Sequence, residues 1–219
     1  MIALYPSLMA ADLLNLKSEI SALEPLCSGF HLDIMDHSFV PNLTWGTDMV
    51  NAIRLATKKP LWIDLLVDQP SFYIDQMHLN AGDIVTVHYE SKSIINNREV
   101  VASITSALRA KGIIASLAIN PKTPTKTFAP FLDLIDHAQL MSVDPGFSGR
   151  PFFAGTPSRL LELQALLKAK NKKLLIGVDG GINETTFLSI KNLGVNMVAI
   201  GSGIFARPDK IKALKWYRQ

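Results

Sequence analysis

One short segment of the chain combines residue types that could hold a metal ion or move a proton. Residues 30–36 read Phe-His-Leu-Asp-Ile-Met-Asp, an apolar run interrupted by polar side chains. Because side chains alternate between the two faces of a strand, His31, Asp33 and Met35 would share one face. An imidazole and a carboxylate beside a polarizable thioether are an unusual set for a structural core. We therefore expect this face to belong to a metal-binding or proton-transfer site.

Short apolar segments recur along the chain and predict eight buried strands. They lack strict alternation of apolar and polar residues, as expected for strands that are covered on both faces. Amphipathic segments between them predict eight helices. The strands are predicted at residues 2–5, 30–35, 61–67, 84–88, 113–119, 139–143, 174–178 and 197–200, and the helices at residues 12–26, 47–56, 71–81, 95–110, 125–131, 157–170, 184–193 and 208–217.

This alternation of strands and helices indicates right-handed βαβ units and a parallel sheet. Eight units of roughly 27 residues each would fill the 219 residues and match a compact TIM barrel. We therefore predict the α/β class, with a single (β/α)8 barrel domain over residues 1–219. The alternative is a doubly wound open sheet, which typically has a glycine-rich turn after its first strand. This chain has Pro6-Ser7-Leu8-Met9 there, which does not favour that alternative.

Polar residues gather where the predicted strands end, and a barrel brings these ends into one ring. Any one of them could be a satisfied polar group of the core. Burying several carboxylates together is costly unless a cation compensates them, so the joint pattern indicates a functional site. The residues are Ser7, His31, Asp33, Asp36, Asp64, His88, Glu90, Asn120, Ser142, Asp144, Asp179 and Ser202.

Glycine clusters follow the seventh and eighth predicted strands, at Gly180-Gly181 and at Gly201-Ser202-Gly203. Glycines let backbone N–H groups approach an anion, and helix N-termini favour negative charge. Many barrels hold a phosphate in the loops that follow these two strands. A third glycine-containing loop, residues 144–149, is suited to covering a ligand. The two glycine clusters together predict a phosphate-binding site.

Taken in order, these motifs resemble the ribulose-phosphate 3-epimerase family over essentially the whole chain. Each motif is short, but eight in the correct order make a chance similarity implausible. The matching stretches are Pro6-Ser7-Leu8, His31-x-Asp33-x-Met35-Asp36, Phe39-Val40-Pro41-Asn42-Leu43-Thr44, Thr86-Val87-His88-x-Glu90, Asn120-Pro121-x-Thr123-Pro124, Met141-Ser142-Val143-x-Pro145-Gly146-Phe147, Val178-Asp179-Gly180-Gly181 and Gly201-Ser202.

The resemblance implies a carbohydrate isomerase of the pentose phosphate pathway, which inverts C3 of D-ribulose 5-phosphate to give D-xylulose 5-phosphate. Inversion needs an acid/base group on each face of a planar enediolate, and the resemblance implies Asp33 and Asp179 for these roles. It also implies one divalent metal ion (Zn, Fe, Mn, Co or Mg) acting as a Lewis acid. The implied metal ligands are His31, Asp33, Asp64 and Asp179, and the implied substrate contacts are Ser7, Met35, His88, Met141, Gly146, Phe147, Ser148, Gly149, Gly180, Gly181, Gly201 and Ser202.

The chain departs from the family motif at one of these ligands. The family pattern on the third strand is Asp-x-His-Leu-Met, whereas this chain has Asp64 at the histidine position and Leu66 at the methionine position. Nearby, His37 stands in place of a glycine, and Arg150 stands in place of a glutamine. The change at Asp64 alters the chemistry of the implied metal site directly.

A ligand set with three carboxylates changes the expected charge and metal preference. Three carboxylates around a divalent ion give the site a formal charge of −1. Two histidines and two aspartates around the same ion would give a formal charge of zero. Carboxylate oxygen is a harder donor than imidazole nitrogen, so selection should move towards Mn²⁺ or Mg²⁺ and away from Zn²⁺. The added charge should also raise the pKa values of Asp33 and Asp179. We therefore expect an epimerase with altered metal preference or reduced rate.

Composition limits the other classes of function. The formal net charge is only +3, and no dense run of Lys and Arg favours nucleic acid. Cys27 is the only cysteine, so no intrachain disulfide can form, and it reads as a small buried residue. We find no signal-peptide pattern and no membrane-spanning stretch, so we expect a cytoplasmic protein. The expected partner is a small sugar phosphate, and the resemblance implies a homo-oligomer.

Three alternative functions remain at this point. The first is an epimerase for a related ketose phosphate, such as D-allulose 6-phosphate. The second is a decarboxylase of the same barrel group, which would need Asp-x-Lys-x-x-Asp, whereas Asp33-Ile34-Met35-Asp36 contains no lysine. The third is a sugar-phosphate-binding barrel with weak or no activity, which Asp64 alone favours.

Overall fold

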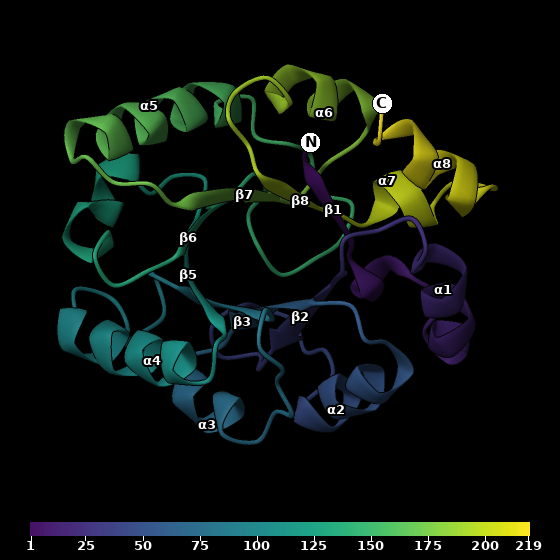
Figure 1. Cartoon of the computed structure of the whole chain (residues 1–219), viewed down its shortest axis with the longest axis horizontal. Coiled ribbons are helices and arrows are strands. Elements are labelled where there is room, and N and C mark those ends of the chain that lie inside the picture. Colours follow the sequence, from purple (N-terminus) through teal and green to yellow (C-terminus); the bar gives the residue numbers. More distant parts are fainter.

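Eight parallel strands form a nearly closed barrel in the computed structural model, which describes residues 1–219 (Figure 1). Every strand is buried along almost its whole length, which explains why the sequence lacks strict alternation. The strands are β1 (Ala3–Pro6), β2 (Phe30–Met35), β3 (Leu61–Leu66), β4 (Ile84–His88), β5 (Ile114–Ile119), β6 (His137–Met141), β7 (Leu175–Asp179) and β8 (Met197–Ile200).

The order of the strands excludes the doubly wound alternative. Each strand pairs in parallel with the next one along the chain from β2 to β8, and β1 pairs with β8. Between β1 and β2 the ring is joined only by an isolated parallel bridge from Ser7 to His31. The predicted (β/α)8 barrel is therefore confirmed.

Helices surround the barrel and cover its outer face (Figure 1). Between the strands and these helices lies a continuous core of 47 buried apolar residues. The α-helices are α1 (Leu16–Leu23), α2 (Thr47–Ala56), α3 (Pro70–Ile74), α4 (Arg98–Ala110), α5 (Thr156–Ala169), α6 (Glu184–Ile190), α7 (Ser202–Phe205) and α8 (Lys210–Trp216), and the 3-10 helices are η1 (Leu8–Ala10), η2 (Leu13–Asn15) and η3 (Thr125–Phe131).

Most predicted elements match, but several differ, among them β6, α3 and α7. β6 begins two residues earlier than predicted, because the polar residues His137 and Gln139 face the barrel interior instead of interrupting the strand. The helix predicted at residues 71–81 ends at Ile74, and the chain turns before β4. The four-residue helix α7 was not predicted, because so short a segment has no detectable periodicity. Cys27 is buried just after α1, as predicted.

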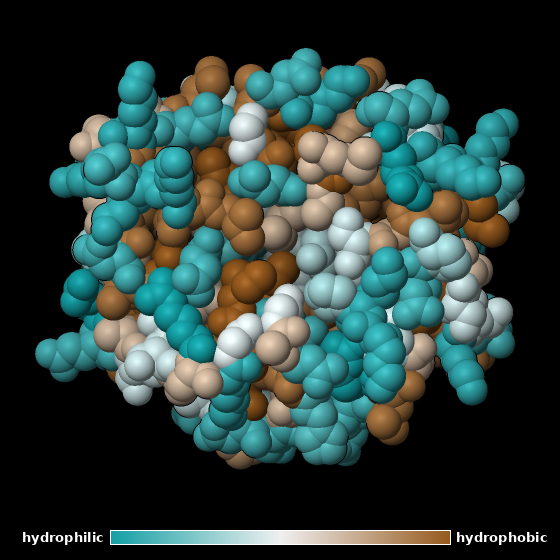
Figure 2. Space-filling view, viewed as in Figure 1, coloured by the Kyte–Doolittle hydropathy of each residue, from teal (hydrophilic) through white to brown (hydrophobic).

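Polar residues dominate the edge of the molecule in the view of Figure 2, whereas residues of intermediate and high hydropathy show near its centre. None of the helices combines the length and the apolar character that a membrane span requires.

Candidate active site

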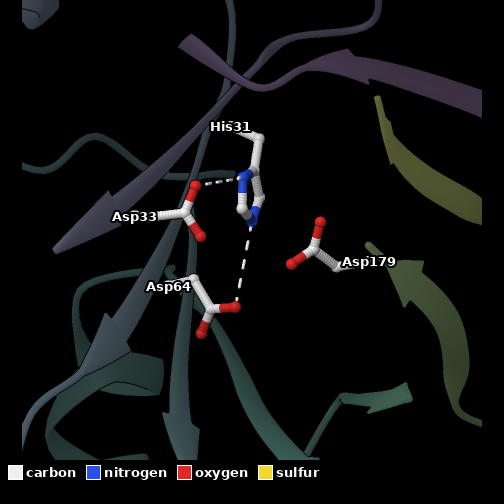
Figure 3. Close-up of side chains that lie close together, drawn as sticks. All are labelled: His31, Asp33, Asp64 and Asp179. Atoms are coloured by element: carbon white, nitrogen blue, oxygen red, sulfur yellow. Dashed lines mark ion pairs between the residues drawn. The ribbon is translucent and has the colours of Figure 1, made fainter. Parts of the chain in front are cut away.

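Four side chains from three strands meet at one end of the barrel (Figure 3). His31 and Asp33 lie on β2, Asp64 on β3 and Asp179 on β7, and one ligand atom from each lies within 4.8 Å of the others. Asp33 and Asp64 are direct neighbours in the register of β2 and β3. Asp179 approaches from the opposite side of the group (Figure 3). Residues far apart in the sequence therefore form the cluster that the ring of strand ends predicted.

A cavity lies above this cluster and is walled by the loops that follow β6, β7 and β8. Asp33 and Asp179 reach the cavity, whereas His31, Asp64 and His88 are fully buried and do not line it. His88, which the resemblance implied as a substrate contact, instead bonds to Asp64. The other predicted contacts all line the cavity, namely Ser7, Met35, Met141, Gly146, Phe147, Ser148, Gly149, Gly180, Gly181, Gly201 and Ser202.

Ser7 links the two site residues of β2. Its hydroxyl donates to Asp33 Oδ2 at 3.1 Å and lies 3.3 Å from His31 Nδ1. Because that hydroxyl proton goes to Asp33, the Ser7 oxygen accepts from a proton on His31 Nδ1. His31 Nε2 has no hydrogen-bond partner and is buried. This nitrogen is therefore available as a ligand towards the centre of the cluster.

Both oxygens of Asp64 are held by side chains of other strands, one on the neighbouring strand β4 and one on β6. His88 Nε2, on β4, lies 2.6 Å from Asp64 Oδ1. Gln139 Nε2, on β6, lies 2.6 Å from Asp64 Oδ2. The second oxygen is also 3.9 Å from His31 Nε2. Asp64 is thus a fully buried carboxylate whose position is fixed by two donors.

The two groups that face each other across the cluster have shifted pKa values. Burial raises the pKa of Asp179 to about 7, with the charge of His31 opposing and those of Asp33 and Asp64 adding to the shift. Burial alone would lower the pKa of His31, but the charges of Asp33 and Asp179 outweigh it and raise the value to about 9. A carboxyl group with a pKa near 7 can both accept and release a proton close to neutral pH.

His88 offsets the extra negative charge that Asp64 brings. Burial disfavours a charged imidazole, but the adjacent carboxylate of Asp64 raises the pKa of His88. Burial likewise disfavours the Asp64 carboxylate, but His88 lowers the pKa of Asp64. The raised pKa of His88 favours its cationic form, which would offset part of the formal charge of −1 expected for the metal-loaded ligand set. The sequence did not indicate this pairing.

The residues of the cluster fit a divalent metal ion. The donor set is one imidazole and three carboxylates, and the buried, unpartnered His31 Nε2 faces them. Ligand atoms on opposite sides of an ion with bonds of about 2.1 Å are roughly 4.2 Å apart, so small side-chain movements would let these atoms share one ion. Metal binding would displace the proton from His31 Nε2. His31, Asp33, Asp64 and Asp179 can hold such an ion.

The loops after β6 and β7 form the opposite wall through their backbone. Gly180 and Gly181 have φ values of 104° and 64°, which side-chain-bearing residues rarely adopt. A Cβ on Gly180 would lie 2.4 Å from Val143 Cγ2, so this turn also needs glycine for packing. Ser142 donates to the carbonyl of Asp179 and holds the turn in place.

Other polar residues at the strand ends shape loops and do not reach the cluster. Asp36 accepts hydrogen bonds from the backbone of Ser38 and Asp68, and Glu90 accepts one from the backbone of Asn120. Asp144 is exposed. Asp36 and Glu90 thus hold loop backbone, a structural role that any single polar residue at a strand end could have.

Sequence reasoning missed two residues of the site, Gln139 and Arg150. Gln139 lies at the first position of a predicted apolar strand, where its polar amide was the available signal. Arg150 is the only basic residue that lines the cavity, and its guanidinium carbon lies 5.3 Å from the ring centre of Phe147. Arg150 Nε is buried and has no partner. The sequence showed that Arg150 stands in place of a glutamine, but it did not show that Arg150 lines the cavity.

The chain is similar to known proteins over nearly its whole length. A model of the ribulose-phosphate 3 epimerase family matches residues 3–205. The chain is 33% identical over 220 residues to ribulose-phosphate 3-epimerase of Bacillus subtilis (strain 168), covering 100% of this chain and 99% of that protein. It is 32% identical over 215 residues to the chloroplastic ribulose-5-phosphate-3-epimerase of Arabidopsis thaliana, covering 98% of this chain and 75% of that protein.

Solved structures of other barrels share the fold at low sequence identity. A 3-hexulose-6-phosphate synthase superposes with a TM-score of 0.66 at 13% identity, covering 99% of this chain and 98% of that one. KGPDC from Streptococcus mutans superposes with a TM-score of 0.70 at 12% identity, covering 100% and 96%. These likenesses show the barrel alone, whereas the family model and the curated relatives extend over nearly the whole sequence. The chain belongs to the ribulose-phosphate 3-epimerase family.

Proposed function

We propose that this protein epimerises D-ribulose 5-phosphate at C3 to give D-xylulose 5-phosphate. The observation that carries the proposal is the position of Asp33 and Asp179, on β2 and β7, which reach one cavity from opposite sides of a cluster able to hold a metal ion. Inversion at a carbon next to a carbonyl requires one proton acceptor and one proton donor on opposite faces of a planar intermediate. Two carboxyl groups that face each other satisfy this requirement.

In the proposed reaction one carboxylate removes the C3 proton, and the opposite carboxyl group supplies a proton to the other face. In the metal-free cluster burial raises the pKa of Asp179 to about 7, and a bound cation would lower this pKa. Ser7 donates to Asp33 and fixes the direction of its carboxylate. Met35 and Met141 line the cavity and would keep water away from the planar intermediate.

The cluster would hold a divalent metal ion through His31, Asp33, Asp64 and Asp179. When bound, such an ion supplies a Lewis acid that stabilises negative charge on the substrate oxygens at C2 and C3. Ser7 and His88 then act on the ligands: Ser7 orients Asp33 and His31, and His88 holds Asp64 and offsets its charge.

We further propose that the loops after β6, β7 and β8, which form the loop wall of the cavity, hold the phosphate of the substrate. Arg150 would contribute its positive charge there. The turns at Gly180-Gly181 and Gly201-Ser202 border the same cavity as Arg150. A Cβ on Gly181 would lie 3.0 Å from the backbone of Phe152, so the chain just after Arg150 packs against this turn. A guanidinium group binds phosphate through charge-assisted hydrogen bonds.

The decisive experiment follows the C3 proton of the substrate in D₂O by NMR. Protein stripped with a chelator is supplied separately with Mn²⁺, Zn²⁺, Fe²⁺, Co²⁺ or Mg²⁺ and then with D-ribulose 5-phosphate. We expect D-xylulose 5-phosphate carrying deuterium at C3, with Mn²⁺ or Mg²⁺ more effective than Zn²⁺ because carboxylates dominate the ligand set.

D-Allulose 6-phosphate is tested in parallel, since the same chemistry would serve a longer ketose phosphate. A higher kcat/KM for that substrate would move the proposal to the related epimerase. Binding of ribulose 5-phosphate without product or deuterium exchange, whichever metal is supplied, would instead identify a sugar-phosphate-binding barrel and overturn the proposed reaction.

A further inference from the structure

Gln139 is a fully buried side chain inside the barrel whose amide makes hydrogen bonds at both ends. Its Oε1 lies 3.1 Å from Trp62 Nε1 and 2.9 Å from Thr86 Oγ1. Its Nε2 lies 2.6 Å from Asp64 Oδ2 and 3.2 Å from Met141 Sδ. This one side chain thus connects β6 with β3 and β4 across the interior of the barrel.

The chemistry of Trp62 fixes which way the amide points. The indole N–H can only donate, and it is shared between Thr86 Oγ1 at 3.0 Å and Gln139 at 3.1 Å, so the carbonyl oxygen of Gln139 and not its NH₂ group faces it. The NH₂ group then faces Asp64 and donates to its carboxylate. Reversing the amide would place two donors against each other at Trp62 and two acceptors against each other at Asp64. Gln139 is therefore held in one orientation.

This orientation controls the carboxylate of Asp64. Gln139 holds one oxygen and His88 holds the other, each at 2.6 Å, so the plane of the carboxylate cannot rotate without breaking a buried hydrogen bond. Each oxygen retains a second lone pair, and the oxygen held by Gln139 is the one nearest His31 Nε2, at 3.9 Å. Groups that orient metal ligands in this way commonly strengthen metal binding.

We propose that Gln139 is a positioning residue that holds Asp64 in the orientation needed to bind the divalent cation. The inference rests on the metal site of the proposed function but not on the reaction itself. Its alternative is that Gln139 only satisfies buried polar groups of the core. These two roles predict different results. A positioning residue affects metal affinity only when Asp64 is present, whereas a structural residue affects the fold whether or not Asp64 is present.

The test measures Mn²⁺ binding to the substrate-free protein by calorimetry, with the EPR spectrum of bound Mn²⁺ as a second readout. Gln139→Leu removes the donor to Asp64 and keeps a side chain of similar size. We expect the Kd for Mn²⁺ to rise about 10–100-fold, the usual effect of losing a partner of a metal ligand. The EPR spectrum should also change, because one ligand becomes free to rotate.

A double-mutant cycle with Asp64→Ala separates the two roles. When Asp64 is absent, Gln139→Leu should change the Kd for Mn²⁺ by less than about twofold, because the residue through which it acts is missing. An equal loss with and without Asp64 would show a structural role and overturn the proposal. An unchanged Kd in the single variant, or no Mn²⁺ binding by the unmodified protein, would overturn it as well.

Ser116→Ala is the matched control. It removes a buried 2.8 Å hydrogen bond to His137 inside the same barrel without touching the cluster, and it should leave the Kd unchanged. If the leucine variant does not fold, as judged by circular dichroism, Gln139→Met replaces it. Because no step of the test requires turnover, failure of the epimerase proposal and failure of this inference give different results.

Discussion

The two walls of the active-site cavity are built in different ways. One wall, the strand wall, presents Asp33 of β2 and Asp179 of β7, which lie against the buried side chains of His31 and Asp64. The other is made of loops after β6, β7 and β8, where backbone conformation sets the shape and Arg150 is the only cation. We therefore expect substitutions in the strand wall to change metal binding and kcat. We expect substitutions in the loop wall to change KM and local stability.

The largest effect should come from replacing Asp179, the proposed acid/base group on β7. Asp179→Asn keeps the size of the side chain but cannot exchange a proton, so we expect kcat to fall about 10³-fold. Asp144→Asn is the control, because Asp144 is an exposed carboxylate just after β6. Steady-state kinetics that show only a KM change for Asp179→Asn would contradict the division between the two walls.

A smaller effect, and one confined to KM, should follow from removing the cation of the loop wall. In Arg150→Gln we expect KM for D-ribulose 5-phosphate to rise about 10–100-fold with kcat within about threefold, because a charge-assisted hydrogen bond is lost. Activity on unphosphorylated D-ribulose should not change. Arg218→Gln, at an exposed arginine near the chain end, serves as control. Equal losses on both substrates would show that Arg150 does not act through the phosphate.

The loop wall should also lose stability when its backbone conformation is restricted. Gly180→Ala combines a φ of 104° with a close contact to Val143, so we expect it to lower the free energy of unfolding by about 2 kcal/mol in urea titrations. Gly149→Ala separates the two causes, since its φ is 76° but no atom lies within 4 Å of its Cβ position. If the two variants lose the same stability, packing against Val143 contributes nothing.

A different effect, which depends on pH, should arise at the buried His137. Burial lowers the pKa of His137 to about 3. The unfolded chain therefore binds this proton first as the pH falls below about 6.5, and the folded state loses about 1.4 kcal/mol per pH unit towards pH 3. His137→Gln removes this loss, so its unfolding free energy should depend less steeply on pH than that of the unmodified protein. Identical slopes between pH 6.5 and 4.5 would contradict the low pKa.

Local patterns in the sequence were sufficient for the barrel and for much of the cluster. The apolar run of β2 was predicted with its observed ends, Phe30–Met35, and the alternation of its side chains brings His31 and Asp33 to one face. β6 was misplaced because an inward-facing polar residue in a barrel looks like the end of a strand. The inward direction of His137 and Gln139 depends on neighbouring strands that a local pattern does not describe.

The sequence by itself determined the eight strand–helix units, the ring of polar strand ends and the family, because each depends on residue types at fixed spacing. Only the tertiary structure decided what surrounds Asp64. Its partners His88 and Gln139 are 24 and 75 residues away, and the register of the barrel strands brings them within 2.6 Å. From the sequence, Asp64 was an excess negative charge at an implied metal site. In the fold it is a carboxylate held by two donors and balanced by a neighbouring imidazole, because electrostatic interactions depend on distances in space and not on positions along the chain.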